Sequence, residues 1–228
     1  MVHYRSISLS LISQFDILSV PELAPPENIS ISDANTDDTN NEAASTVDVY
    51  IPTYPLSQFW LAYTVSPPHP PGVIYYFKLY LNDIHVVSWG TSRENGYSGK
   101  TMFGLFDGGQ DWTGEQCVER HVLCFGDGQQ QAREDIIEVR VFRAKGRVRL
   151  AKSLIERVRS RVNKGKKSRK EYEKPTGIRL VNAGIIEHNH PQNYYKYALI
   201  DRLDQPFATF RFHCKTWGRK LVQLDRQH

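Results

Sequence analysis

The sequence predicts an all-β protein: an antiparallel β-sandwich or jelly roll with one or two short helices and two polar insertions. Three observations predict this fold. Roughly ten short segments are rich in β-branched and aromatic residues and are separated by turns, often with Gly or Pro. Strand and helix patterns do not alternate as they would in a parallel α/β sheet. The 228 residues are 40% hydrophobic and 24% charged, which suits one folded domain over residues 1–228.

The first strand is expected near the N-terminus. Ile7, Leu9 and Leu11 alternate with serines, which is the period of a half-buried strand. The alternation, followed by Asp16, is unlike the unbroken apolar core of a cleaved signal peptide. The chain has three cysteines, so at least one stays unpaired, and a reducing compartment is the simpler interpretation. We therefore expect a location in the nucleus or cytoplasm.

An acidic flexible insertion is predicted at residues 21–46. Pro, Asn, Asp, Thr and Ser dominate this stretch, and large apolar residues are few. Between Arg5 and Lys78 the chain has no Lys or Arg, but it has eight acids. The insertion could be a solvated loop or an interaction site, and both interpretations stay open.

The remaining strands follow from apolar and aromatic runs. In the run at 73–81, Tyr75 and Phe77 share one face, and Lys78 marks the opposite face as the wetter one. Asn82 and Asp83 form a tight turn signal, so the following run is expected to pair with it as a hairpin. The expected strands are 47–51, 58–65, 73–81, 84–89, 101–106, 121–125, 135–142, 178–181, 194–200 and 208–214.

A basic helix and linker insertion is predicted at residues 143–176. Between residues 140 and 170 there are fourteen Lys or Arg and one acid. Leu150, Leu154, Val158 and Val162 recur at helical spacing, and a compact cationic run follows them. A second short helix is expected near Trp217.

The basic segment is the strongest functional signal of the sequence. Clustered cations can bind an import receptor or neutralise the phosphates of a nucleic acid. The alternative is a solvated linker that pairs with the acidic insertion. The candidate residues for nuclear import or nucleic-acid contact are Arg157, Arg159, Arg161, Lys164, Lys166, Lys167, Arg169 and Lys170.

Metal and catalytic signals are weak. Cys117, His121 and Cys124 resemble half a zinc site in residue type, but the spacing is not that of a common finger. We therefore expect no metal, no cofactor and no catalytic residues. Whether the protein is an enzyme stays open, although the sequence favours a non-enzymatic protein, because a paired-carboxylate site is an alternative. The many aromatic residues leave a second alternative, an enzyme or carbohydrate-binding sandwich that uses an aromatic-lined face.

Several stretches resemble a family of filamentous-fungal hypothetical proteins, a domain of unknown function. The resemblance runs over nearly the whole chain and implies a fungal, intracellular origin. It brings no catalytic or binding residues, and the basic run falls where that family varies. The stretches are VDVYIPTYPLSQFWLAYTVSPPHPP, YYFKLYLNDIHVVSWG, GYSGKTMFGLFD, LVNAGII and HPQNYYKYALIDRLDQPFATFRF.

Together these observations predict a non-enzymatic intracellular interaction module in the nucleus. It would associate with nucleic acid without sequence preference through residues 143–170. Its protein partner is unknown, apart from an import receptor if the module is nuclear. No membrane partner is expected, because no apolar stretch reaches 18 residues and the mean hydropathy is −0.49.

Overall fold

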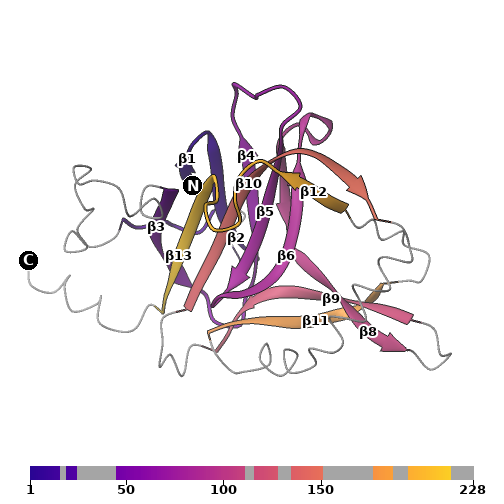
Figure 1. Cartoon of the computed structure of the whole chain (residues 1–228). Helices are drawn as coiled ribbons and strands as arrows, with labels where there is room; N and C mark the ends of the chain where they lie inside the picture. Colours follow the sequence, from indigo (N-terminus) through magenta and orange to yellow (C-terminus); the bar gives the residue numbers. More distant parts are fainter. Residues whose placement is uncertain are drawn as a thin grey trace, which may run out of the picture.

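Two β-sheets face each other in the computed structural model of this chain (Figure 1). The structure describes residues 1–15, 19–24, 45–110, 116–127, 135–150, 177–186 and 195–216. Within these residues the chain is nearly all β, which confirms the predicted all-β sandwich. The described helical structure is a short 3₁₀ turn, η2 (Arg93–Asn95). In the described part of the chain, no helix combines the length and the apolar character needed to cross a membrane.

The seven-stranded sheet has the order β1-β2-β4-β9-β11, with β7 paired to β4 and β8 to β9. The six-stranded sheet has the order β3-β13-β10-β5-β6, with β12 paired to β10. The strands are β1 (Val2–Tyr4), β2 (Ile7–Ser13), β3 (Thr46–Thr53), β4 (Gln58–Val65), β5 (Ile74–Leu81), β6 (Ile84–Thr91), β7 (Ser98–Thr101), β8 (Phe103–Gln110), β9 (Gln116–Phe125), β10 (Asp135–Arg149), β11 (Ile178–Ile186), β12 (Tyr195–Leu199) and β13 (Ala208–Thr216).

One strand pair departs from the predicted antiparallel arrangement. β3 runs parallel to β13, from Thr46 opposite Thr209 to Thr53 opposite Thr216. A parallel pair cannot be joined by a tight turn, and here most of the chain separates the two strands. The six-stranded sheet is therefore mixed.

The core lies between the sheets and is built from alternate residues of the strands. Phe77 of β5 is fully buried, and its ring is stacked on Trp89 of β6, with 5.3 Å between the ring centroids. On the seven-stranded sheet, the rings of Phe59 (β4) and Phe125 (β9) are stacked with 4.5 Å between their centroids. Because β-strand side chains alternate, the burial of one set leaves the other set on the outer face of each sheet.

Many predicted elements are found in place. β4 has the predicted bounds, and Asn82 and Asp83 both have positive φ in the two-residue turn between β5 and β6, as a type I′ hairpin requires. β10 differs, because it continues to Arg149. Residues 143–149 are therefore strand and not part of a helix and linker insertion. The predicted helix at 150–162, the helix near Trp217 and most of the acidic insertion lie outside the described residues.

Candidate functional site

The outer face of the six-stranded sheet carries alternating cations and aromatic rings. On β5 the buried Phe77 and Leu79 leave Tyr76, Lys78 and Tyr80 on this face. In the strand register Lys78 lies opposite Arg140 of β10, and Tyr80 lies opposite Glu138. Arg211 of β13 completes the row beside Glu138. We call this set the cationic face: Tyr76, Lys78, Tyr80, Glu138, Arg140 and Arg211.

Positive charge is concentrated in this part of the structure. β5, β10 and β12 together have seven Lys or Arg and two acids. β2 and β4, in the middle of the opposite sheet, have no charged residue. The seven cations are Lys78, Arg140, Arg143, Lys145, Arg147, Arg149 and Lys196.

Aromatic rings hold several of these cations in place. The Arg140 guanidinium carbon lies 4.6 Å from the centroid of the Tyr80 ring. The Lys78 Nζ lies 5.6 Å from the centroid of Phe142 and 5.9 Å from that of Tyr76. A cation over a ring face is attracted by the ring quadrupole, so these side chains lose little further freedom when they contact a ligand.

Arg140 and Lys78 differ in whether a carboxylate balances their charge. Glu138 is buried, and its carboxylate accepts hydrogen bonds from Arg140 Nε at 2.5 Å and from Arg211 Nε at 2.6 Å. Lys78 forms no ion pair with any described carboxylate. Burial lowers the pKa of the Lys78 ammonium, and the Arg140 guanidinium lowers it further. An anion bound beside Lys78 would favour the charged ammonium and so oppose both effects.

A histidine and a serine lie on the β6 side of Lys78. Ser88 is the cross-strand partner of Lys78, and His85 Nε2 lies 2.7 Å from Ser88 Oγ. Burial lowers the pKa of His85, and Lys78 adds to that shift. Both effects disfavour a charged imidazole beside Lys78.

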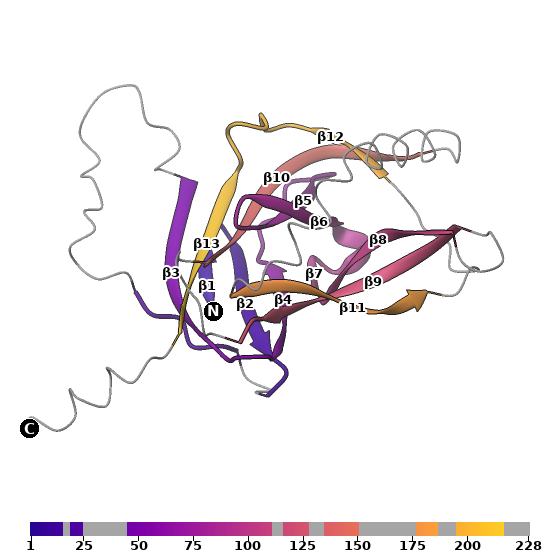
Figure 2. The same ribbon diagram turned by 90° about the horizontal axis from the view of Figure 1, so that it is seen from below.

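Beyond Ala144 the described part of the sheet continues as two strands, β10 and β12. The register of β10 with β5 ends at Ala144, whereas β10 and β12 stay paired to the end of β10. We call residues 145–149 of β10 together with β12 the ribbon (Figures 1 and 2). Tyr197 of the ribbon is stacked on Tyr76 with 4.3 Å between ring centroids. A Cβ on Gly90 would lie 2.5 Å from the Tyr197 hydroxyl, so only glycine allows this approach.

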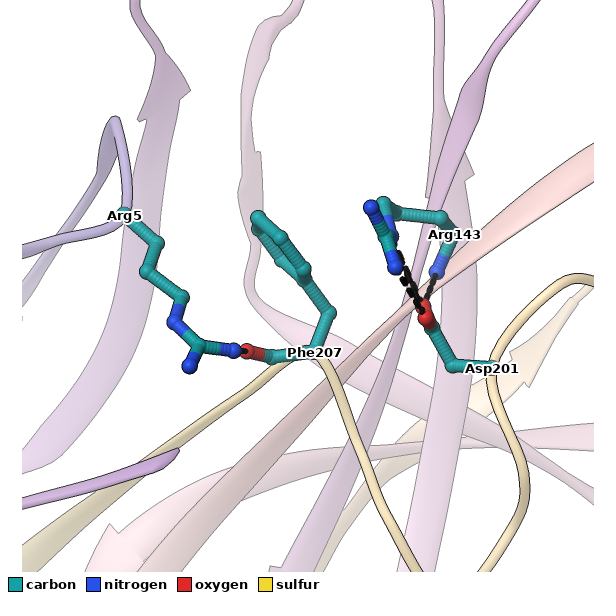
Figure 3. A network of polar contacts seen from close by, with 4 residues as sticks. All are labelled: Arg5, Arg143, Asp201 and Phe207. Atoms are coloured by element: carbon teal, nitrogen blue, oxygen red, sulfur yellow. Dashed lines mark hydrogen bonds and ion pairs between the residues drawn. The ribbon is translucent and has the colours of Figure 1, made fainter. Parts of the chain in front are cut away.

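A polar network fixes the base of the ribbon (Figure 3). The buried Asp201 carboxylate accepts hydrogen bonds from the Arg143 backbone N–H at 2.6 Å and from Arg143 Nη2 at 2.6 Å. The Phe207 ring lies between two guanidiniums, with Arg143 at 4.5 Å and Arg5 at 5.4 Å from its centroid. Arg5 also donates a hydrogen bond to the Phe207 carbonyl. The connection from β12 to β13 is therefore anchored to β10.

None of the eight basic residues predicted from the sequence lies in the described part of the chain. The structure instead identifies the cations of the cationic face, which the sequence analysis did not select. Lys145, Arg147 and Arg149 of the ribbon lie within the predicted segment 143–170, although they were not among the eight candidates. The one sequence signal for the cationic face was the alternation over β5, which predicted that the face with Lys78 is the more solvent-exposed one. Neighbours across strands, such as Lys78 and Arg140, have no signature in the linear sequence.

The structure gives little support to the metal site or to the sugar-binding face. His121 lies 2.9 Å from the Glu119 carboxylate, and Cys124 is buried on the opposite side of β9. Among the described residues, no three potential ligands come together as a metal site. The rings expected on a sugar-binding face are divided, because Tyr75 is buried in the core and Tyr76 and Tyr80 have cations over their faces.

Comparison of the chain with protein-family models, curated proteins and solved structures found no match.

The tyrosines give a prediction for alkaline solution. Burial raises the pKa values of Tyr63, Tyr75, Tyr80 and Tyr197 above the ordinary value of 10.0. A raised pKa in the folded state stabilises the fold below pH 10.0, and this contribution is lost as the pH rises through the folded-state values. The lowered pKa of Lys78 has the opposite effect on stability as the pH rises, but it concerns one group, whereas four tyrosines have raised pKa values. Urea unfolding should therefore become easier above pH 10.0, and absorbance at 295 nm should show late-titrating phenols. Titration of every tyrosine at its ordinary pKa in the folded protein would contradict the prediction.

Proposed function

We propose that this chain is a non-enzymatic interaction module that binds nucleic acid without sequence preference through its cationic face. The observation that carries the proposal is Lys78, a half-buried cation beside Arg140 with no carboxylate partner among the described residues. Such a site gains most from a ligand that supplies negative charge. A phosphate polymer supplies that charge at many positions.

The rings support a backbone-binding role more than base or sugar stacking. Arg140 lies over Tyr80, Lys78 over Tyr76, and Tyr197 is stacked on Tyr76. Ring faces used in this way are less open to a sugar or a base. Contacts with phosphates fix position and carry no sequence information, which agrees with binding that is independent of sequence.

The basic segment would add phosphate contacts and would direct the chain to the nucleus. The cations continue along β10 as Lys145, Arg147 and Arg149, and the eight basic residues follow in the sequence between β10 and β11. The nuclear location and the import receptor are parts of the proposal that rest on this segment alone.

Lys78→Gln is expected to weaken nucleic-acid binding about three- to tenfold at low salt. The substitution keeps much of the aliphatic stem and removes the charge that lacks an ion-pair partner. Fluorescence anisotropy with a labelled 20-nucleotide oligomer, measured over a range of salt concentrations, tests this. The slope of log K against log salt should become shallower by about one, because about one phosphate contact is lost.

Lys100→Gln is the matched control, because Lys100 is an exposed cation on β7 of the opposite sheet. It makes the same change in net charge and should alter the affinity less than twofold. If the parent protein binds no oligomer even at low salt, the proposal is wrong. Equal effects of the two substitutions would show that net charge acts without the cationic face.

A further inference from the structure

The ribbon is free on both edges in the described part of the chain. From Lys145 onward β10 is paired with β12 alone, in the register Arg147 with Tyr197, Val148 with Lys196 and Arg149 with Tyr195. Both views of the ribbon diagram show β12 beside the distal half of β10 (Figures 1 and 2). It is a two-stranded antiparallel element supported by the sandwich from one side.

The side facing the sandwich is occupied. Tyr197 is stacked on Tyr76, and Arg147 forms an ion pair with Glu94 at 2.7 Å. The Arg147 guanidinium also lies over the Tyr195 ring, 4.6 Å from its centroid. These contacts leave the opposite side of the ribbon to face solvent, because side chains alternate along each strand.

The outward side combines cations with a small apolar centre. Lys196 is exposed on this side, and Lys145 is exposed at the bulge where β10 leaves the sheet. Arg149 is exposed too, but its pairing with Tyr195 puts it on the same side as Arg147. The two strands of the ribbon contain no acidic residue. Val148, the cross-strand partner of Lys196, is 70% exposed.

We infer that the ribbon enters the major groove of duplex DNA. This inference rests on the proposed function and names the form of nucleic acid and the element that enters its groove. A B-DNA major groove is about 12 Å wide and admits a two-stranded ribbon, whose strands are about 4.8 Å apart. The cations of the ribbon would contact phosphates on the groove walls.

Other nucleic acids fit this element less well. The major groove of A-form RNA is deep and too narrow for side chains to read. A single strand offers no groove, and its recognition depends on open ring faces for stacking, whereas the ring faces of Tyr76 and Tyr195 are covered. Duplex DNA is therefore the one occupant that matches the shape and the charge of the ribbon.

The test compares three labelled DNAs by anisotropy with the full chain at one salt concentration. They are a 20-base-pair duplex, its single strand, and the same duplex with bulky groups on pyrimidine C5, which project into the major groove. We expect the duplex to bind about tenfold more tightly than the single strand, and the bulky groups to remove most of this preference. Lys196→Glu should weaken duplex binding about tenfold, and the matched Lys100→Glu less than twofold.

Each outcome separates the inference from the proposed function. Equal affinity for duplex and single strand, or an unchanged affinity for the C5-modified duplex, overturns the ribbon inference and leaves nucleic-acid binding in place. Unchanged duplex binding by Lys196→Glu also overturns it. Absence of salt-dependent binding to any of the three DNAs overturns both. Lys196 is exposed, so a loss of folding is not expected in its variant.

Discussion

Asp201→Ala is expected to lower the free energy of unfolding by about 3 kcal/mol, near the lower end of the range for breaking a buried ion pair. Only 8% of the Asp201 side chain is exposed, and it accepts hydrogen bonds from both the backbone and the side chain of Arg143. Its removal leaves a guanidinium and a backbone N–H without their acceptor. The Arg143 side chain is 38% exposed, and water can replace part of what is lost, which keeps the effect at the lower end.

Urea unfolding of Asp201→Ala, Arg143→Ala and the double variant measures the coupling between the two side chains. The coupling should be large, because each single variant leaves the other group unpaired. Asp204→Ala is the matched control. Asp204 pairs with Arg202 at 2.8 Å, both side chains are mostly exposed, and no measurable change is expected. Equal stability of Asp201→Ala and Asp204→Ala would show that the network in Figure 3 does not hold the ribbon base.

The elements that the sequence predicts well are those with a local signal. β4 and the β5–β6 hairpin depend on alternation and on a turn that accepts positive φ, and both are readable over a few residues. The pairing of β3 with β13 is different, because it joins Thr46 to Thr209 across most of the chain. No local pattern indicates such a pair, and its parallel direction was not predicted.

The extent of β10 shows a second limit. Residues 143–149 have few apolar side chains, so the alternation that marks a half-buried strand is lost there. Residues 145–149 of β10 are paired with β12 alone in the described part of the chain and border no core on their outward side, so they need no such alternation. A strand stabilised by its partner and by a few ring contacts therefore has the composition of a linker.

The sequence predicted the positive charge of the candidate site but not the residues that form it. The sequence indicates that cations gather after residue 140, and the described structure adds that Arg140 lies beside Lys78 of a distant strand. The Arg143–Asp201 pair joins residues 58 apart in the chain. Such clusters depend on the register between strands, which sequence patterns do not determine at the level of single residues.

Glu138→Gln should lower stability and tighten polyanion binding at the same time. The Glu138 side chain is 6% exposed and is the shared carboxylate of Arg140 and Arg211. Losing its charge weakens two charge-assisted hydrogen bonds, so we expect about 2 kcal/mol less stability, allowing for the partial exposure of both arginines. Arg140 lies opposite Lys78 and would lose its charged partner, so binding of an oligonucleotide should become about three- to tenfold tighter at low salt.

Asp204→Asn separates this effect from a change in net charge. It removes one negative charge at an exposed ion pair on the connection between β12 and β13, outside the cationic face. Its affinity for the oligonucleotide should stay within twofold of the parent. Urea unfolding and anisotropy on the same samples give both quantities. Weaker binding by Glu138→Gln, with the fold intact, would mean that Glu138 positions Arg140 for the ligand and does not compete with the ligand for it. Tighter binding with lower stability would mean that the buried carboxylate holds the cationic face together and limits its affinity.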